Sequence, residues 1–539
     1  MNIDKTVQRL SKYRLILILV LGLLLAVLRL NEHLMPAGDN ATYIVLGQSL
    51  VMGRGYRMIS DPHSPEMALY PPGYPLLLAG ILALTGTAPQ LMAAILPLKL
   101  PSVLFFLGII ALVYDLLRRR SDFLATTTAL LTAVHPHLLY FATEIGTEIP
   151  YLFVSLCCLW LFERCRREFS TSLIVALAVL IALASYIRSI ALVLAFAFVV
   201  YLFVQKRAKH TWLLFIVVGV LVVPWFIYGS LLPTTGTSVG LGRSYFPLYF
   251  ASDPYGTARA SLSDWIERLA QNTYYYALEI WPNILFAHAP EVSTWLGRLT
   301  SGFATMLTLL LLFGFCLEMR HRHVQEWYVA LFFLACLCYL WPVARLVVPI
   351  VPFALYYFLV AIGYLLLCAR GWRQPHRTRL QHWERFALIA VCTVLALSAL
   401  VSDVRSIRRN LRYGLGQPVG VYYSKDAEWG NYLQAMDWIA QNTAPQSIVM
   451  CRKPDLLYIM IGHQALEYPY SSQWLDLKRS VLENHVAYII EDAFHWTLTT
   501  RDYLRPALQG WLAVEPEALA LVYETDTPHT RVWRVNQLH

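Results

Sequence analysis

The sequence places a carboxylate, Asp39, directly after its first long apolar run, in the segment GDNATY. Asp in this position is a common helix N-cap, because its carboxylate accepts hydrogen bonds from the first backbone amides of the helix. The same carboxylate at a water-facing site could act as a general base and take a proton from an acceptor hydroxyl. Position in the sequence leaves both interpretations open.

Two glutamates four residues apart, Glu144 and Glu148, lie in the short polar segment TEIGTEIP, with no basic residue near them in the sequence. Like charges at this spacing repel weakly, so the pair indicates solvent exposure or a bound cation. Carboxylate oxygens suit hard divalent ions, which makes both residues candidate ligands for Mg²⁺ or Mn²⁺. Alternatively, Glu148 simply begins a helix whose dipole favours its negative charge.

Two isolated arginines, Arg188 and Arg345, lie between apolar runs. A guanidinium group binds phosphate through a fork of hydrogen bonds, so both are candidate ligands of an anionic substrate. Anchoring at a membrane interface is the alternative interpretation. His135 and His137 do not share a helical face at their spacing, so we do not expect a metal site at this pair.

The composition indicates what kind of molecule holds these residues. Of the 539 residues, 57% are hydrophobic and only 14% are charged, whereas about a quarter of a soluble protein is charged. A soluble enzyme, a disordered scaffold and a nucleic-acid-binding domain are therefore disfavoured. We expect a membrane protein with several spans.

Apolar runs bounded by charged residues predict a mainly α-helical bundle with about eleven membrane spans. The runs lie near residues 15–34, 92–117, 122–141, 147–163, 171–187, 189–204, 211–229, 299–318, 325–342, 346–369 and 384–403. The break between the fifth and sixth runs depends on Tyr186, Arg188 and Ser189. Lys and Arg gather in every second connection, which places the N-terminus inside and the C-terminus outside. Because this sorting accounts for about 20 of the 43 basic residues, the net charge of +9 indicates no nucleic-acid partner.

Two long connections are expected on the outer face. Residues 35–91 predict two short helices, in DNATYIVLGQSLVMGRG and YPPGYPLLLAGILAL, the first with one apolar face for the membrane surface. Residues 230–298 are rich in aromatic side chains, which are typical of a membrane interface and also suit a sugar or lipid cleft. These aromatic residues are Tyr245, Phe246, Tyr249, Tyr255, Trp265, Tyr274, Tyr275, Tyr276 and Trp281, and His288 lies close to them.

The tail, residues 404–539, contains no run long enough to cross a membrane and is long enough for a small core of its own. The spacing of Trp429, Leu433 and Met436 predicts a helix over residues 426–442. Short apolar runs predict strands near residues 447–451, 486–490, 519–523 and 531–535. The tail is thus predicted to be a small extracytoplasmic α/β domain, following a catalytic membrane domain of residues 1–403.

The segments DNATYIVLGQSLVMGRGY and YPPGYPLLLAG resemble the start of bacterial glycosyltransferases of the GT-C superfamily. Within that superfamily, the chain is similar to the aminoarabinose transferases and the protein O-mannosyltransferases. The resemblance extends over the membrane region. It implies a multi-pass enzyme of the bacterial inner membrane that takes a sugar from a polyprenyl-phosphate-linked donor. The sugar would pass to a lipid, glycan or protein acceptor on the extracytoplasmic face.

Residue by residue, the resemblance implies that Asp39 is the catalytic base and that Glu148 is a second catalytic residue, with Glu144 as its helper. It implies that Arg188, Arg345 and Tyr70 hold the phosphate and sugar of the donor. The implied reaction is an inverting displacement, in which the acceptor oxygen attacks the anomeric carbon and the lipid phosphate leaves. Many relatives have an acidic residue directly after the aspartate. Asn40 stands there in this chain, which weakens the case for a metal.

Two other functions fit the sequence. A transporter of lipid-linked glycans would have charged residues within spans or broken helices. Arg29, and Lys99 between Pro97 and Pro101, are the residues of this kind. A ligase that moves a whole glycan shares the expected fold and differs in the mass of its product.

Overall fold

A computed structural model describes residues 2–35, 38–87, 91–165, 170–232, 249–252, 259–286, 295–371, 382–414, 423 and 426–536. The chain divides into two compact units. We call residues 1–30, 99–224 and 260–409 the helical unit, and residues 31–98, 225–259 and 410–539 the mixed unit. The first long connection therefore belongs to the same unit as the C-terminal tail.

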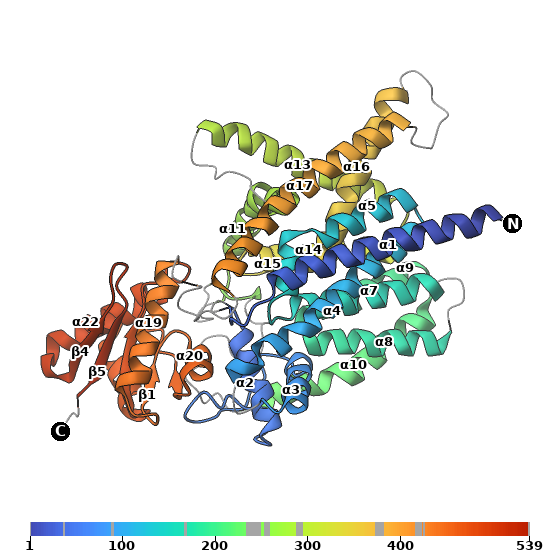
Figure 1. Ribbon diagram of the computed structural model, residues 1–539. Helices are drawn as coiled ribbons and strands as arrows, with labels where there is room; N and C mark the ends of the chain where they lie inside the picture. Colours follow the sequence, from blue (N-terminus) through green and yellow to red (C-terminus); the bar gives the residue numbers. More distant parts are fainter. Residues whose placement is uncertain are drawn as a thin grey trace. The chain divides into compact units, whose positions relative to one another are not determined.

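The helical unit is built from long and short helices, three of which (α4, α10 and α17) have one end in the mixed unit. The helices are α1 (Asn2–Arg29), α4 (Leu91–Arg118), α5 (Asp122–Ala133), α6 (Pro136–Ala142), α7 (Glu148–Cys165), α8 (Thr171–Ile187), α9 (Leu192–Val204), α10 (Ala208–Leu231), α11 (Leu262–Tyr275), α12 (Trp281–Leu285), α13 (Trp295–Met319), α14 (Val324–Cys338), α15 (Ala344–Val347), α16 (Val351–Gly371) and α17 (His382–Tyr413). Figure 1 shows their arrangement.

The predicted spans coincide with helices. By length and composition, five described stretches are suited to cross a membrane: Leu91–Arg118, Ala208–Leu231, Ser301–Met319, Ala344–Ala369 and Arg385–Tyr413. The break predicted near Arg188 is confirmed, since α8 ends at Ile187 and α9 begins at Leu192. The third predicted span consists of two helices, because the chain is extended at His135 between α5 and α6. The number of spans and their orientation remain predictions.

Two predicted boundaries differ from the structure. The tail was expected to begin after residue 403, but α17 continues to Tyr413 and the two units divide after Arg409. A broken helix near Lys99 is not observed, because α4 runs without interruption through Pro97 and Pro101. The feature that favoured a transporter is therefore absent from this helix.

Close contacts between helices stabilise the helical unit. Gly314 of α13 lies against the backbone of α16, where a Cβ atom would come within 1.8 Å of the carbonyl oxygen of Tyr357. Small residues permit such close approach, which is a common means of packing helices in membranes. Arg29 of α1 and Asp403 of α17 form a buried ion pair of 2.6 Å. The charge of Arg29 thus has a partner within the unit.

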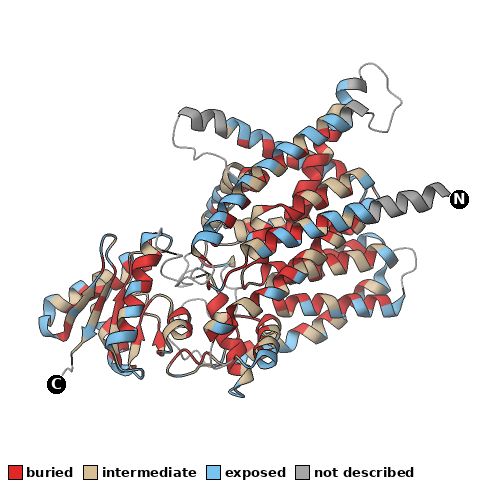
Figure 2. Cartoon of the chain, in the orientation of Figure 1, coloured by how far each residue is buried: buried red, intermediate tan, exposed pale blue. Residues whose placement is uncertain are grey.

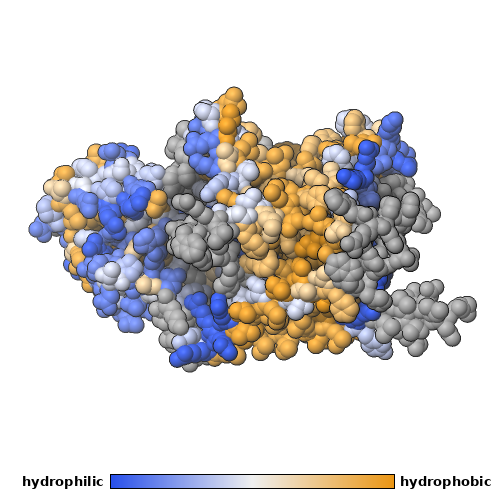
Figure 3. Space-filling model, turned by 90° about the horizontal axis from the view of Figure 1, so that it is seen from above, coloured by the Kyte–Doolittle hydropathy of each residue, from blue (hydrophilic) through white to orange (hydrophobic). Residues whose placement is uncertain are grey.

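The outer surface of the helical unit is hydrophobic. Large apolar side chains are exposed on several helices, among them Leu17, Phe203, Phe215, Val220 and Leu309. Figure 3 shows that hydrophobic residues form a broad area over the helices. Since a water-soluble protein rarely exposes so large an apolar area, this surface is suited to contact lipid.

The first long connection forms the two short helices that the sequence predicts, α2 (Asn40–Val51) and α3 (Gly73–Thr85). The predicted amphipathic character of α2 is wrong. Residues Tyr43–Ser49 are all buried, so the middle of the helix has no exposed face (Figure 2). It packs against α3 and against α20 (Pro454–Ile461) of the tail. An apolar sequence with two packing partners has no face left for the membrane surface.

The tail contains a five-stranded mixed sheet with the strand order β2-β1-β3-β5-β4. The strands are β1 (Ile448–Met450), β2 (Ala465–Leu466), β3 (Val486–Glu491), β4 (Leu519–Glu524) and β5 (Arg531–Val535), and the helices are α19 (Ala427–Asn442), α20, α21 (Trp474–Glu483) and α22 (Arg505–Val514). β1 pairs in parallel with β2 and β3, whereas β5 is antiparallel to β3 and β4. The sequence predicts α19 and four of the strands, and it misses β2, which has two residues.

Helices pack on both faces of this sheet. Trp438 of α19 stacks on Tyr523 of β4 at 5.6 Å and contacts Tyr488 of β3. On the other face, Trp511 of α22 and Leu477 of α21 join a buried cluster with Ile489 of β3. The tail therefore has a hydrophobic core of its own, which holds its loops in place.

Candidate functional site

Asp39 occupies the N-cap position of α2, but its side chain does not cap the helix. Instead, its Oδ1 accepts a hydrogen bond of 3.0 Å from the hydroxyl of Tyr70. Asp39 is half-buried, whereas Tyr70 is almost fully buried. Helix capping therefore does not explain the conformation of the Asp39 side chain.

The partner of Asp39 is held by other aromatic residues. The ring of Tyr43 makes edge contacts with the rings of Tyr70, at 5.3 Å, and Tyr74, at 5.2 Å. The backbone carbonyl of Tyr70 accepts a hydrogen bond of 2.8 Å from the hydroxyl of Tyr56. Pro71 and Pro72 restrict the chain between Tyr70 and α3. The tyrosine hydroxyl is therefore fixed in position before any substrate binds.

The tail contributes a basic side chain to this region. Lys453 precedes α20, and its Nζ donates a hydrogen bond of 3.2 Å to the carbonyl of Gly38, next to Asp39. Its ammonium also lies 5.1 Å from the centre of the Trp496 ring. Burial and the nearby charge of Arg452 lower the pKa of Lys453 to about 8, while the negative charge of Asp39 acts in the opposite direction.

Asp455 fixes the start of α20 on the first connection. One of its oxygens accepts a hydrogen bond of 2.5 Å from Thr42, and the other accepts one of 2.6 Å from Ser60. Burial raises the pKa of Asp455, and these two hydrogen bonds act against that rise. A backbone hydrogen bond of 2.9 Å, from the amide of Ala465 to the carbonyl of Ser60, adds to the attachment. Lys453 is therefore held beside Asp39 by neighbouring contacts.

A second group of predicted residues comes together in the helical unit. Glu148 begins α7, is buried, and its Oε1 lies 2.8 Å from a terminal nitrogen of Arg188 and 3.6 Å from Nε of Arg345. Gly146 permits this arrangement, because a Cβ atom there would come within 2.7 Å of the other carboxylate oxygen of Glu148. The sequence selects these three charges separately, and the structure joins them in one ion-pair cluster.

Glu144 has a different partner from Glu148. Its Oε2 lies 3.1 Å from Nζ of Lys99, a lysine that is fully buried in α4. Within the part of the chain that the structure describes, no group of three or more His, Cys, Asp and Glu side chains is placed to hold a metal ion. Each of the two glutamates has a basic partner, and the Mg²⁺ or Mn²⁺ site at this pair remains a prediction. The positively charged groups beside these two carboxylates are Lys99 and Arg188.

The remaining candidate residues either pack against other parts of the helical unit or lie outside the described residues. The Nε2 atom of His135 lies 2.9 Å from the carbonyl oxygen of Ile284. Tyr276 and Trp281 of the second long connection are buried and contact Phe333. Tyr245, Phe246, Tyr255 and His288 lie outside the described residues.

Sequence reasoning misses Lys453 and Asp455, although both stand at a recognisable helix start. The sequence Lys453-Pro454-Asp455 places proline at the first helical position and an acidic residue in the first turn. These two features predict a helix, but they do not predict which surface that helix contacts. More than 400 residues separate Asp455 from Thr42.

Residues 70–228 match the family model described as dolichyl-phosphate-mannose-protein mannosyltransferase. No curated protein matches the sequence. The fold is similar to that of the archaeal oligosaccharyltransferase AglB from Archaeoglobus fulgidus, solved with an inhibitory peptide and a dolichol-phosphate. That match has a TM-score of 0.57 at 12% identity and covers 98% of this chain and 74% of AglB.

The chain also resembles ArnT from Cupriavidus metallidurans, solved bound to undecaprenyl phosphate. The TM-score is 0.55 at 13% identity, and the match covers 96% of this chain and 97% of ArnT. The predicted resemblance to the GT-C superfamily is confirmed at the level of the fold.

Proposed function

We propose that this protein is a membrane glycosyltransferase that transfers a sugar from a polyprenyl-phosphate-linked donor to a lipid, glycan or protein acceptor. The observation that carries the proposal is Asp39, a partly exposed carboxylate oriented by Tyr70 rather than by helix capping, in a chain with the GT-C fold. The structures of AglB and ArnT contain dolichol-phosphate and undecaprenyl phosphate, respectively, which supports a donor of this class. The location that goes with this activity is the extracytoplasmic face of the bacterial inner membrane.

In the proposed reaction, Asp39 takes the proton from an acceptor hydroxyl as that oxygen attacks the anomeric carbon of the donor. The bond from the anomeric carbon to the phosphate oxygen breaks, and polyprenyl phosphate leaves with the bonding electrons. The configuration at the anomeric carbon is inverted. Tyr70 holds the carboxylate of Asp39 by its hydrogen bond, so the base does not have to be reoriented during the reaction.

Arg345 is the proposed ligand of the donor phosphate. Its side chain is the more exposed of the two arginines at Glu148, at 36% against 14% for Arg188. Positive charge at the leaving phosphate stabilises the transition state, because negative charge develops there. Glu148, which is buried between two basic groups, has the role of orienting these arginines rather than of transferring a proton.

Replacement of Asp39 tests the proposal. We expect Asp39→Asn to lower the rate of sugar transfer about 100- to 10,000-fold, which is the usual contribution of a general base. The assay follows a radiolabelled sugar from synthetic polyprenyl-phosphate donors to cell-envelope acceptors. The matched control is Asp526→Asn, an exposed aspartate of the same unit. Equal rates for Asp39→Asn and the unchanged protein would remove Asp39 as the base.

A second candidate is a ligase that transfers a whole glycan, which the fold similarity to the oligosaccharyltransferase AglB favours. Both reactions need a base at the acceptor and a cation at the leaving phosphate. The mass of the product separates them, because the acceptor gains one sugar in the first case and several sugars in the second.

A further inference from the structure

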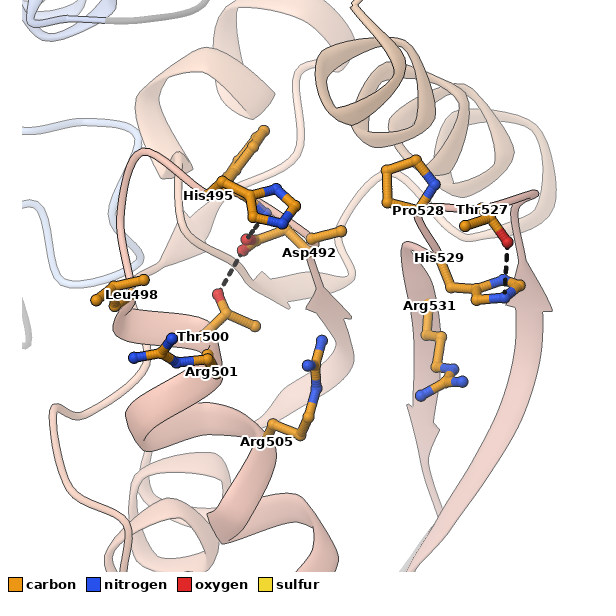
Figure 4. A pocket seen from close by; sticks show the side chains of 12 residues that line it. Asp492, His495, Leu498, Thr500, Arg501, Arg505, Thr527, Pro528, His529 and Arg531 are labelled. Atoms are coloured by element: carbon orange, nitrogen blue, oxygen red, sulfur yellow. Dashed lines mark hydrogen bonds between the residues drawn. The ribbon is translucent and has the colours of Figure 1, made fainter. Parts of the chain in front are cut away.

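The C-terminal domain contains a cavity of about 490 Å³, separate in sequence from Asp39 and Tyr70. Figure 4 shows Arg501 and Arg505 on one side of it and Arg531, with the segment Thr527–His529, on the other. Arg505 begins α22 and Arg531 begins β5. The volume lies in the range of pockets that hold small molecules, which is about 300–1,000 Å³.

Two of the arginines are fixed by carboxylates outside the cavity. Nε of Arg505 donates a hydrogen bond of 2.7 Å to Glu491, and Nε of Arg531 donates one of 2.7 Å to Glu524. Glu491 is buried and also accepts a hydrogen bond of 3.0 Å from the indole of Trp533. Because Nε is engaged in both cases, the plane of each guanidinium is set, and Figure 4 shows both side chains beside the cavity. Such a preset fork matches the oxygens of phosphate or carboxylate.

The positive charge of the lining exceeds its negative charge. Asp492 is the one acidic residue among the lining residues, all of which belong to the described part of the chain. Its two oxygens accept hydrogen bonds from the hydroxyl of Thr500, at 2.8 Å, and from the amide of Phe494, at 3.1 Å. The carboxylate is fully buried and satisfied by donors of its own segment. Three arginines also line the cavity, and each has a carboxylate partner outside the lining: Arg501 pairs with Asp502, Arg505 with Glu491, and Arg531 with Glu524, while Arg531 also lies 3.8 Å from Glu491.

The lining also has an apolar part. Phe494, Leu498 and Pro528 line the cavity together with the hydroxyl-bearing Thr500 and Thr527. Apolar surface with a few fixed polar groups is typical of sites for organic ligands rather than for a bare ion. We propose that this cavity binds a small organic anion, with its phosphate or carboxylate group between Arg505 and Arg531.

This proposal does not depend on the transferase function, because none of the lining residues belongs to the Asp39 or Glu148 groups. Binding can be measured without sugar transfer. The probes are glucose 1-phosphate, glucuronate and neutral glucose, which have the same ring and differ in charge. Each is titrated against the full-length protein in lipid nanodiscs, and binding is followed by saturation-transfer NMR. We expect the two charged sugars to bind with Kd values of about 1 mM or lower, and glucose to bind at least tenfold more weakly.

Arg531 and Arg534 provide a matched pair of variants on β5. Residues three apart in a strand lie on opposite faces, and Arg534 is exposed and does not line the cavity. We expect Arg531→Gln to weaken binding of the charged sugars about tenfold and Arg534→Gln to leave it unchanged. Equal effects of the two variants, equal binding of glucose, or no binding of either charged sugar would overturn the proposal.

Loss of folding is a separate outcome of Arg531→Gln that a second variant addresses. Arg505→Lys keeps a positive charge beside Glu491 and removes the guanidinium fork, so the domain is expected to remain folded. We expect it to weaken binding several-fold. Unchanged binding in this variant, with an unchanged thermal midpoint, would contradict the role of Arg505. The two charged probes distinguish the ligand classes, since the tighter one identifies phosphate or carboxylate as the preferred group.

Discussion

Asp39 of the mixed unit and Glu148 of the helical unit both stand at the start of a helix, and their surroundings differ. Asp39 is partly exposed and is oriented by a neutral tyrosine hydroxyl, with a lysine on the neighbouring carbonyl. Glu148 is buried, and one of its oxygens faces two arginines. A carboxylate that must reach a substrate proton needs access, whereas one between two guanidinium groups is suited to fixing them. We therefore propose catalysis for Asp39 and positioning for Glu148.

The largest expected effect on stability is at Glu148. Glu148→Gln removes the negative charge between Arg188 and Arg345, and breaking a buried ion pair costs about 3–5 kcal/mol. We expect Asp39→Asn to cost less than about 1 kcal/mol, because Asp39 has no capping role and is partly exposed. Thermal unfolding of both variants in the same detergent measures the difference. A similar loss of stability in the two variants would contradict the proposed difference between Asp39 and Glu148.

Tyr70→Phe is expected to have the next largest effect, on activity rather than on folding. A hydrogen bond to a charged group contributes about 1.5–3 kcal/mol, so its loss should lower kcat/KM about tenfold or more. Tyr458→Phe, a half-buried tyrosine of α20, is the matched control. An unchanged kcat/KM in Tyr70→Phe would show that the hydroxyl does not orient the base.

Lys453 gives the mixed unit a pH dependence of stability. Its pKa of about 8 in the folded protein lies below its ordinary value of 10.5, so between these pH values the unfolded chain binds more protons. Stability contributed by this group is therefore present above pH 10.5 and is lost as the pH falls through 8. The slope is at most about 1.4 kcal/mol per pH unit. Thermal unfolding between pH 7.5 and 10 should show a smaller slope in Lys453→Met than in the unchanged protein, and identical slopes would contradict this prediction.

The smallest effect is expected at an exposed ion pair of the first connection. Arg57 and Glu66 are 2.5 Å apart, but about two fifths of each side chain is accessible to solvent. Exposed pairs contribute about 0–1 kcal/mol, so Arg57→Gln should change the stability by less than 1 kcal/mol. Comparison with Glu148→Gln tests whether the burial of an ion pair, rather than its charge alone, determines the loss of stability. A loss as large as that of Glu148→Gln would contradict it.

The sequence predicts the elements better than their contacts. The break at Arg188, the two helices of the first connection and the strand Arg531–Val535 follow from local patterns of charge, proline and apolar residues. The pairing of Glu148 with Arg345 joins residues nearly two hundred positions apart, and no local pattern records it. The burial of α2 was missed for the same reason, since its covering helix, α20, comes from the tail.

Acidic residues near an apolar boundary were the informative part of the sequence. Residue type and position indicate Asp39, Glu144 and Glu148, and in the structure each has a specific partner. The nature of the partner could not be predicted, because Lys99 is hidden in an apolar helix and Lys453 in a domain with no recognised motif. This is why the sequence suggests a metal ion where the structure has basic side chains.

The attachment of Asp455 to Thr42 has a consequence for the synthesis of the protein. The ribosome adds Asp455 413 residues after Thr42, which takes on the order of 20–80 s at ordinary rates of elongation. Until then, the first connection lacks the helix that packs against α2 and the lysine beside Gly38. A chain that stops before α20 would possess Asp39 and every predicted span, and yet it would lack the helix that packs against α2.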